Sequence, residues 1–200
     1  MRIGVLTSSR ADFGIYEPLI NKLILEKEIN LEIIAFGSHL SKLHGFTLND
    51  IIEKYQKKCK IHQVSSLLVN DDEISVATSY GLTAMKFSEF WDSNKYGLVF
   101  CLGDRFEMSA AVQASIPFGV KLAHIHGGET TLGAIDNIYR HQITLASTLH
   151  FTSTEKYKKR VCNILDSNQN IFSIGALSLS EIKLFKPINK KKLLQKFNIK

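Results

Sequence analysis

Cysteine is scarce in this 200-residue chain, and its three cysteines, Cys59, Cys101 and Cys162, are odd in number and widely spaced. This pattern suggests no disulfide framework and shows no metal-ligand spacing, so we expect reduced thiols in a cytoplasmic protein. Long apolar runs are also missing, and no segment could span a bilayer. The N-terminus turns polar at Thr7, too soon for a signal peptide. We therefore expect no membrane partner.

Two nucleotide-binding signatures are absent as well. No Gly-x-Gly-x-x-Gly follows the first apolar segment and no Walker A sequence occurs, which disfavours NAD and ATP enzymes of those types. We expect no cofactor. Basic residues are not enriched in the main body, because the formal charge of +6 equals that of residues 176–200, where seven lysines face one acid, Glu181. A basic surface for nucleic acid is therefore absent, and the lysine run predicts a solvated helix face.

What the chain does contain is a regular alternation of apolar and amphipathic segments. The apolar segments are continuous, which is typical of strands buried on both faces of a parallel sheet. With helices between the strands, this order predicts an α/β fold with a doubly wound, Rossmann-like parallel sheet. The expected strands are 3–6, 31–36, 61–64, 98–102, 120–123, 149–152 and 170–174.

Capping and proline signals define the expected helices. The first should cover about 15–26, with Pro18 tolerated near its first turn. Caps and acids at residues 70–73 begin a long helix over about 74–91. Thr152 with Glu155 makes a capping box for a helix near 156–165. The other expected helices are 48–57, 106–115 and 135–146.

One polar stretch organises the chain: His124-Ile125-His126-Gly127-Gly128-Glu129-Thr130-Thr131, directly after a buried-looking strand. Polar groups that are desolvated without partners cost free energy, so folding alone would not gather these residues there. A helix that carries Asp136, Arg140 and His141 follows. We interpret the stretch and this helix as the functional site.

Three polar loops should meet at one edge of the sheet, because ligands of doubly wound sheets bind at the carboxyl ends of the strands. They carry Arg10, the pair Asp104 and Arg105, and the stretch that begins at His126. Arg105 could clamp a phosphate with its planar guanidinium, at a helix N-terminus that favours the same anion. Asp104 could act on a proton. The alternative for this pair is a capping Asp and a surface Arg.

Two further pairs admit a structural and a functional interpretation. Asp136 and Arg140, four residues apart, fit an ordinary helix ion pair worth about 0.3–0.5 kcal/mol, but their place beside Glu129 favours function. His124 and His126 should share one face of a strand. Because no third ligand stands at a diagnostic spacing, we expect no metal site. The other histidines are interpreted as structural: His39, His44, His62 and His150.

Five separated motifs occur in order along the chain. They are Ser9-Arg10-Ala11-Asp12-Phe13-Gly14, Gly103-Asp104-Arg105-Phe106-Glu107, His124-Ile125-His126-Gly127-Gly128-Glu129, Gly133-Ala134-Ile135-Asp136 and Arg140-His141. Together, over residues 1 to about 180, they resemble the hydrolysing UDP-N-acetylglucosamine 2-epimerases, most closely the bacterial sialic- and legionaminic-acid type. The resemblance implies the N-terminal half of a glycosyltransferase-B-like fold, with the active site between two Rossmann-like domains, and a homodimer when full length.

The resemblance also implies the chemistry: UDP is eliminated across C1–C2 of the sugar, and water then adds to the glycal to give free N-acetylmannosamine or a related sugar. Such a reaction needs proton transfer near C2 and stabilisation of the departing diphosphate. His126 stands where part of the family has a glutamate, so the identity of the base stays open. The proton-transfer candidates are Asp104, His126, Glu129 and Asp136. The substrate-binding candidates are Arg10, Arg105, Arg140 and His141.

The length of the chain sets it apart from the family it resembles. Residues 1–180 should form the N-terminal Rossmann-like domain, and residues 181–200 the interdomain connection and the start of a second domain. The 200 residues would then be a truncated piece, inactive alone, of an epimerase in sialic-acid-type nonulosonate biosynthesis. A non-catalytic sugar-nucleotide binding domain is the alternative. The acceptor-side domain of a glycosyltransferase is a third, but it should lack the constellation of Asp104, Asp136 and Arg140.

Two expectations complete the hypothesis. Arg10, Asp104, His126, Glu129, Asp136 and Arg140 should line one cleft at the carboxyl edge of the sheet, because they follow successive buried strands. The substrate is either UDP-N-acetylglucosamine or UDP-N,N'-diacetylbacillosamine. Nothing in the sequence distinguishes a hydroxyl from an acetamido group at C4.

Overall fold

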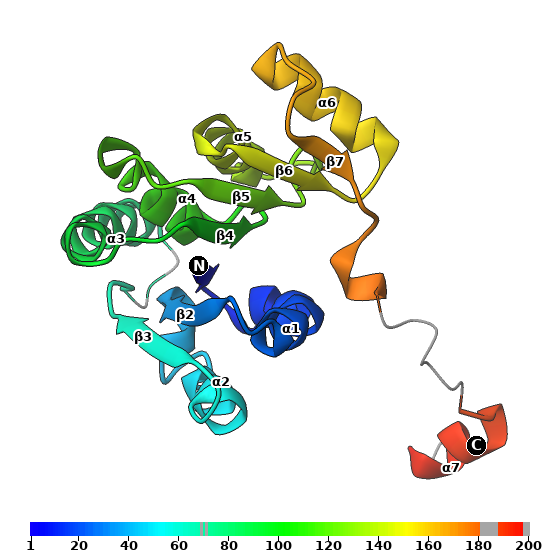
Figure 1. The fold of residues 1–200 in the computed structure, drawn as a ribbon. Coiled ribbons are helices and arrows are strands. Elements are labelled where there is room, and N and C mark those ends of the chain that lie inside the picture. Colours follow the sequence, from blue (N-terminus) through cyan, green and yellow to red (C-terminus); the bar gives the residue numbers. More distant parts are fainter. Residues whose placement is uncertain (69, 71, 181–187, 198–200) are drawn as a thin grey trace.

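A computed structural model describes residues 1–68, 70, 72–180 and 188–197. Seven parallel strands form one sheet in the order β3-β2-β1-β4-β5-β6-β7, which confirms the doubly wound fold and all seven expected strands (Figure 1). The fifth strand begins and ends two residues later than expected. The strands are β1 (Arg2–Thr7), β2 (Asn30–Phe36), β3 (Lys60–Val64), β4 (Leu98–Leu102), β5 (Leu122–Ile125), β6 (Leu149–Thr152) and β7 (Ile171–Ser173).

Helices cover both faces of this sheet, with a hydrophobic core under each layer (Figure 1). α1 (Arg10–Leu25) and α2 (Leu48–Tyr55) cover one face, where Tyr16 and Ile51 are fully buried. α3 (Glu73–Ser93), α4 (Phe106–Gln113) and α5 (Asp136–Ala146) cover the other, where Trp91 is fully buried. The remaining helical segments are α6 (Glu155–Leu165), α7 (Lys190–Lys196) and the short 3₁₀ turns η1 (Gly37–Leu40), η2 (Ile116–Phe118) and η3 (Leu177–Leu179).

The strand order reverses between β1 and β4, which pair in parallel with Ile3 opposite Leu98. From β1 the chain winds outward to β2 and β3, and it then crosses back to β4 and winds the other way. Ligands of open α/β sheets bind outside the carboxyl ends of the strands at such a reversal. The loops after β1 and β4, which carry Arg10 and Asp104, lie at this point.

The first helix begins five residues earlier than expected. Ser9 is its N-cap and accepts a hydrogen bond from the backbone N–H of Asp12 at 3.3 Å. The carboxylate of Asp12 in turn accepts from the hydroxyl of Ser8 at 2.6 Å. Because this cap begins the helix at Arg10 and not at Ile15, Pro18 lies inside the helix and not near its first turn.

Two other helix caps and the lysine run were also predicted from the sequence. Asp72 caps α3, as expected, by accepting from the backbone N–H of Ser75 at 2.8 Å. The capping box of Thr152 and Glu155 is wrong, because Thr154 is the N-cap of α6 and accepts from the N–H of Tyr157. The lysines of α7 are solvent-exposed, as expected, whereas Lys183, Lys186 and Lys200 lie outside the described residues.

Within the described ranges, none of the helices combines the length and the apolar character that crossing a bilayer requires.

Candidate functional site

His124 is a structural brace beneath the candidate site. It is fully buried on β5, with Nε2 2.9 Å from the carbonyl oxygen of Gly103 and Nδ1 3.1 Å from the hydroxyl of Thr144 on α5. Burial lowers the pKa of His124 to about 3, so the ring is neutral near pH 7. Its bonds fix the loop that carries Asp104 against the helix that carries Arg140.

His126 does not share a face with His124, contrary to expectation. β5 ends at Ile125, and His126 takes the left-handed backbone conformation with φ +65°. Such a conformation is uncommon outside glycine and often marks a functional turn. Gly128 follows with φ +76°, and a Cβ there would lie 2.5 Å from the carbonyl oxygen of Tyr157 on α6. The two residues turn the chain sharply and present Glu129 beside His126.

The guanidinium of Arg140 is the centre of the site and is only 4% exposed. It donates to the carbonyl oxygen of His126 at 2.9 Å, to the carboxylate of Asp104 and to the hydroxyl of Thr131 at 3.3 Å. A second carboxylate, that of Glu129, lies 3.7 Å away. The remaining donor, Nε, has no acceptor among the described residues. One buried cation thus holds two carboxylates and one backbone turn.

Glu129 is held from three sides. Its Oε1 accepts from the hydroxyl of Ser153 at 2.5 Å and lies 3.2 Å from Nδ1 of His126, while Oε2 faces Arg140. Partial burial raises the pKa of this carboxyl, but the bonds from His126 and Ser153 and the charge of Arg140 outweigh it, and the net effect lowers the pKa of Glu129. Glu129 is therefore ionised at neutral pH.

The helix ion pair that Asp136 and Arg140 could have formed does not occur in the described chain, because Arg140 turns to Asp104. Asp136 lies half-buried in the first turn of α5. Arg105 pairs with Glu107, with N···O distances of 2.9 and 3.2 Å. The capping-Asp alternative also fails, since residue 105 and not Asp104 precedes α4, without a side-chain cap.

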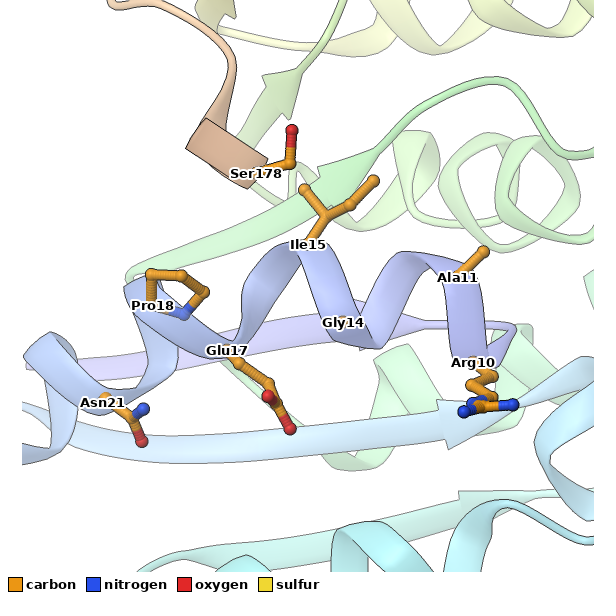
Figure 2. Close-up of a pocket in the computed structure, with 8 residues that line it drawn as sticks. All are labelled: Arg10, Ala11, Gly14, Ile15, Glu17, Pro18, Asn21 and Ser178. Carbon is orange, nitrogen blue, oxygen red and sulfur yellow. The ribbon is translucent and has the colours of Figure 1, made fainter. Parts of the chain in front are cut away.

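Arg10 and His141 lie outside this cluster. Arg10 is exposed at the start of α1 and lines a pocket of about 630 Å³ along that helix (Figure 2). Figure 2 shows Ile15 pointing toward Ser178 of the η3 turn, and Arg10 at the N-terminal end of the helix that lines the pocket. His141 is half-buried, and burial together with the charges of Arg160 and Arg140 lowers its pKa.

The structure therefore joins four of the eight candidates in direct contact: Asp104, His126, Glu129 and Arg140. Two hydroxyl groups that bind this cluster, those of Thr131 and Ser153, are not among the eight candidates. Thr131 was inside the polar stretch, and Ser153 directly follows β6, so the rule of carboxyl-end loops could have found both. Within the described part of the chain, no group of three or more His, Cys, Asp or Glu side chains is placed to hold a metal ion.

The fold and the cluster define a class of protein: a Rossmann-like domain that carries two carboxylates, an imidazole and a buried arginine at its ligand-binding edge. Such groups are typical of proton transfer on a bound ligand. The family model described as UDP-N-acetylglucosamine 2-epimerase matches residues 21–199. The chain belongs to this family.

Named relatives agree with the family. The chain is 36% identical, over 199 residues, to the GDP/UDP-N,N'-diacetylbacillosamine 2-epimerase (hydrolyzing) of Campylobacter jejuni, covering 100% of this chain and 51% of that protein. It is 35% identical over 185 residues to the UDP-N,N'-diacetylbacillosamine 2-epimerase (hydrolyzing) of Legionella pneumophila, covering 92% of this chain and 48% of that protein. The chain thus spans about half the length of these curated relatives.

Solved structures share the fold at low sequence identity. The UDP-GlcNAc 2-epimerase of Neisseria meningitidis, bound to UDP-GlcNAc, superposes with a TM-score of 0.76 at 17% identity, covering 99% of this chain and 54% of that one. The UDP-GlcNAc 2-epimerase of Methanocaldococcus jannaschii gives a TM-score of 0.72 at 15% identity, covering 98% of this chain and 52% of that one.

Proposed function

We propose that the complete protein containing this chain is a hydrolysing UDP-sugar 2-epimerase that releases UDP and a free 2-epimeric sugar. The observation that carries the proposal is the cluster of Asp104, His126, Glu129 and Arg140 at the carboxyl edge of the sheet, in a chain of the 2-epimerase family. A binding domain without catalysis would not need two carboxylates and an imidazole packed around one buried cation.

The reaction sets three demands. A base takes the proton from C2 while the C1–O bond to UDP breaks, and the electron pair of the C–H bond forms the C1=C2 double bond. Water then adds across this bond, with a proton returned to C2 from the opposite face and hydroxide to C1. Proton-transfer groups and a stabilised leaving group are therefore needed together. Asp104, His126, Glu129 and Asp136 are our candidates for the proton steps.

The arginines divide this work in our proposal. The guanidinium of Arg140 is occupied by Asp104 and the turn at His126, and that of Arg105 by Glu107. Arg10 is exposed and forms no ion pair with any residue that the structure describes. Because a guanidinium fork matches phosphate oxygens, Arg10 is the side chain we assign to the diphosphate. Arg140 orients the acid–base groups, and Arg105 and His141 border the site.

Two substrates fit the proposal. UDP-N-acetylglucosamine is the first, and N-acetylmannosamine for sialic-acid-type biosynthesis would then be the product. UDP-N,N'-diacetylbacillosamine is the second, and the two relatives named for that sugar, at 36% and 35% identity, favour it. Assaying the complete protein with each sugar separates the two by their ratio of kcat/KM.

We further propose that residues 1–180 are the N-terminal domain and that residues 181–200 lead to a second domain that grips the nucleotide. The support is the coverage of about half of each relative. A UDP-sugar is the partner we infer, in a cytoplasmic homodimer without nucleic acid or membrane.

The test is release of UDP by the complete protein and by residues 1–200 alone. We expect turnover from the former and almost none from the latter, since each lost donor to the leaving group costs about 10²–10³ in rate. Comparable turnover would show that the catalytic groups or the domain boundary are placed wrongly. No turnover by the complete protein with either sugar would refute the proposed function.

A further inference from the structure

A chain of three side chains crosses the site from β6 to the turn after β5. The hydroxyl of Ser153 donates to Oε1 of Glu129 at 2.5 Å, and the same oxygen lies 3.2 Å from Nδ1 of His126. All three side chains are partly buried. An ionised carboxylate only accepts hydrogen bonds, so the proton between Glu129 and His126 belongs to Nδ1.

The contact of the other ring nitrogen of His126 independently indicates the same position for the proton. Its Nε2 lies 3.4 Å from the backbone N–H of Leu177 in η3. A backbone N–H can only donate, so Nε2 carries a lone pair. Two neighbours on different elements thus require one tautomer, with the proton on Nδ1. The contact with Leu177 is long, and a ligand atom can replace it.

The backbone of His126 is fixed as firmly as its ring. Its carbonyl oxygen accepts from Arg140 at 2.9 Å, and its N–H donates to the carbonyl oxygen of Phe151 at 2.9 Å.

Both oxygens of Glu129 face donors within the chain: Oε1 faces Ser153 and His126, and Oε2 faces Arg140. Glu129 therefore has little basicity left for a substrate proton.

We propose that Ser153 and Glu129 are positioning residues, which hold His126 with its proton on Nδ1 and so present Nε2 as the proton acceptor of the site. The inference rests on the proposed function for the identity of the proton that is taken, and on the geometry alone for the tautomer. Glu129 thereby changes from a proton-transfer candidate to a residue that acts through His126, and Ser153, which directly follows β6, joins the machinery.

The tautomer can be measured without any turnover. Nitrogen-15 NMR of the histidine rings in residues 1–200, at alkaline pH where a free imidazole is neutral, distinguishes a protonated Nδ1 from a protonated Nε2. A His126→Asn variant assigns the signals. We expect protonated Nδ1 in the unaltered chain and a mixture in Glu129→Gln, whose amide can also donate to Nδ1. A proton on Nε2 in the unaltered chain would overturn the inference.

Activity of the complete protein tests the role of Ser153. We expect Ser153→Ala to lower kcat about tenfold, the cost of one hydrogen bond to a charged group, with KM nearly unchanged. Ser153→Thr, which keeps the hydroxyl, should recover most of the rate. Ser173→Ala is the control, because this half-buried serine on β7 makes no side-chain hydrogen bond to the described residues. Equal rates for Ser153→Ala and the control would refute the positioning role, whereas absence of turnover in every variant and in the unaltered protein would refute the proposed function.

Discussion

Two ionic clusters lie at opposite ends of the strands, and they contain similar groups. The amino-end cluster consists of Arg2, Glu32, His62 and Tyr96, and the carboxyl-end cluster of Asp104, His126, Glu129 and Arg140. Each therefore contains an arginine, a histidine and at least one carboxylate. They differ in how completely those groups satisfy one another.

In the amino-end cluster a single carboxylate, that of Glu32, accepts hydrogen bonds from the other three side chains. Arg2 binds both oxygens of Glu32, at 2.8 and 2.7 Å, and His62 and Tyr96 donate at 2.6 and 2.9 Å. Burial opposes the charge on Glu32, but these bonds outweigh it and lower the pKa of Glu32 to about 2. A buried ion with all its partners is expected for a structural role.

In the carboxyl-end cluster the carboxylates outnumber the arginine. Asp104 and Glu129 share Arg140, and their side chains are 23% and 26% exposed. Its histidine has a left-handed backbone. Strain and incompletely neutralised charge cost stability and persist where function requires them. A cluster with groups left for a ligand, and not a cluster as such, is therefore the feature that marks the candidate active site.

The largest effect is expected from Asp104→Asn in the carboxyl-end cluster. If Asp104 moves a proton, kcat should fall by about 10²–10⁴-fold, while the free energy of unfolding falls by about 1–3 kcal/mol because the buried guanidinium of Arg140 loses one charged partner but keeps Glu129. Initial rates of UDP release and urea unfolding measure the two quantities. Asp92→Asn, at an exposed site on α3, is the control. Full activity in Asp104→Asn would remove Asp104 from the mechanism.

Glu32→Gln should do the opposite and lower stability without lowering kcat. The pKa of Glu32 falls from 4.5 to about 2 on folding, which corresponds to about 3 kcal/mol of stability. Since the folded-state pKa is depressed, this stability is present above about pH 4.5 and is lost as the pH falls toward 2. Urea unfolding between pH 7 and pH 3 should show the gap between the unaltered chain and the variant narrowing. A difference in unfolding free energy that does not depend on pH would contradict the lowered pKa of Glu32.

Gly128→Ala tests the turn that carries Glu129. The added Cβ would meet the carbonyl oxygen of Tyr157 at 2.5 Å and Val161 at 2.9 Å, so we expect a loss of about 2 kcal/mol or more in unfolding free energy. Gly45→Ala is matched in its positive φ of +85° but meets nothing within 4 Å. It should cost about 1 kcal/mol. Equal losses, measured by urea unfolding, would mean that contact with α6 does not constrain the turn.

The smallest effect is expected at Arg10, which belongs to neither cluster. Arg10→Ala should raise KM for the UDP-sugar about tenfold, as one charged hydrogen bond to phosphate is lost. Stability should not change, because the side chain is exposed. Steady-state kinetics of the complete protein measure the effect. An unchanged KM would place the diphosphate elsewhere.

The sequence predicted the sheet well because the strands at its centre are rich in consecutive apolar residues, as 98–102 illustrates. It located the start of α1 wrongly because Ser9 and Asp12 form a cap that apolar spacing does not reveal. The sequence predicted that the loops carrying Arg10, Asp104 and His126 lie at the carboxyl edge of the sheet. It did not predict which side chains of these loops pair with one another. Arg140 pairs with Asp104, 36 residues away, and not with Asp136 on its own helix. This pairing depends on how the strands pack. The left-handed turn at His126 is likewise set by tertiary contacts and not by residue type.

A matched pair of substitutions tests the central claim that the two clusters have different roles. Arg140→Lys and Arg2→Lys each replace a branched donor by a single ammonium, in the complete protein assayed for UDP release and for urea unfolding. We expect Arg140→Lys to lower kcat by about 10²-fold or more, because one ammonium cannot hold two carboxylates and the turn at His126. Arg2→Lys should leave kcat unchanged and cost about 1–2 kcal/mol of stability. Equal effects of the two substitutions on kcat would contradict the account.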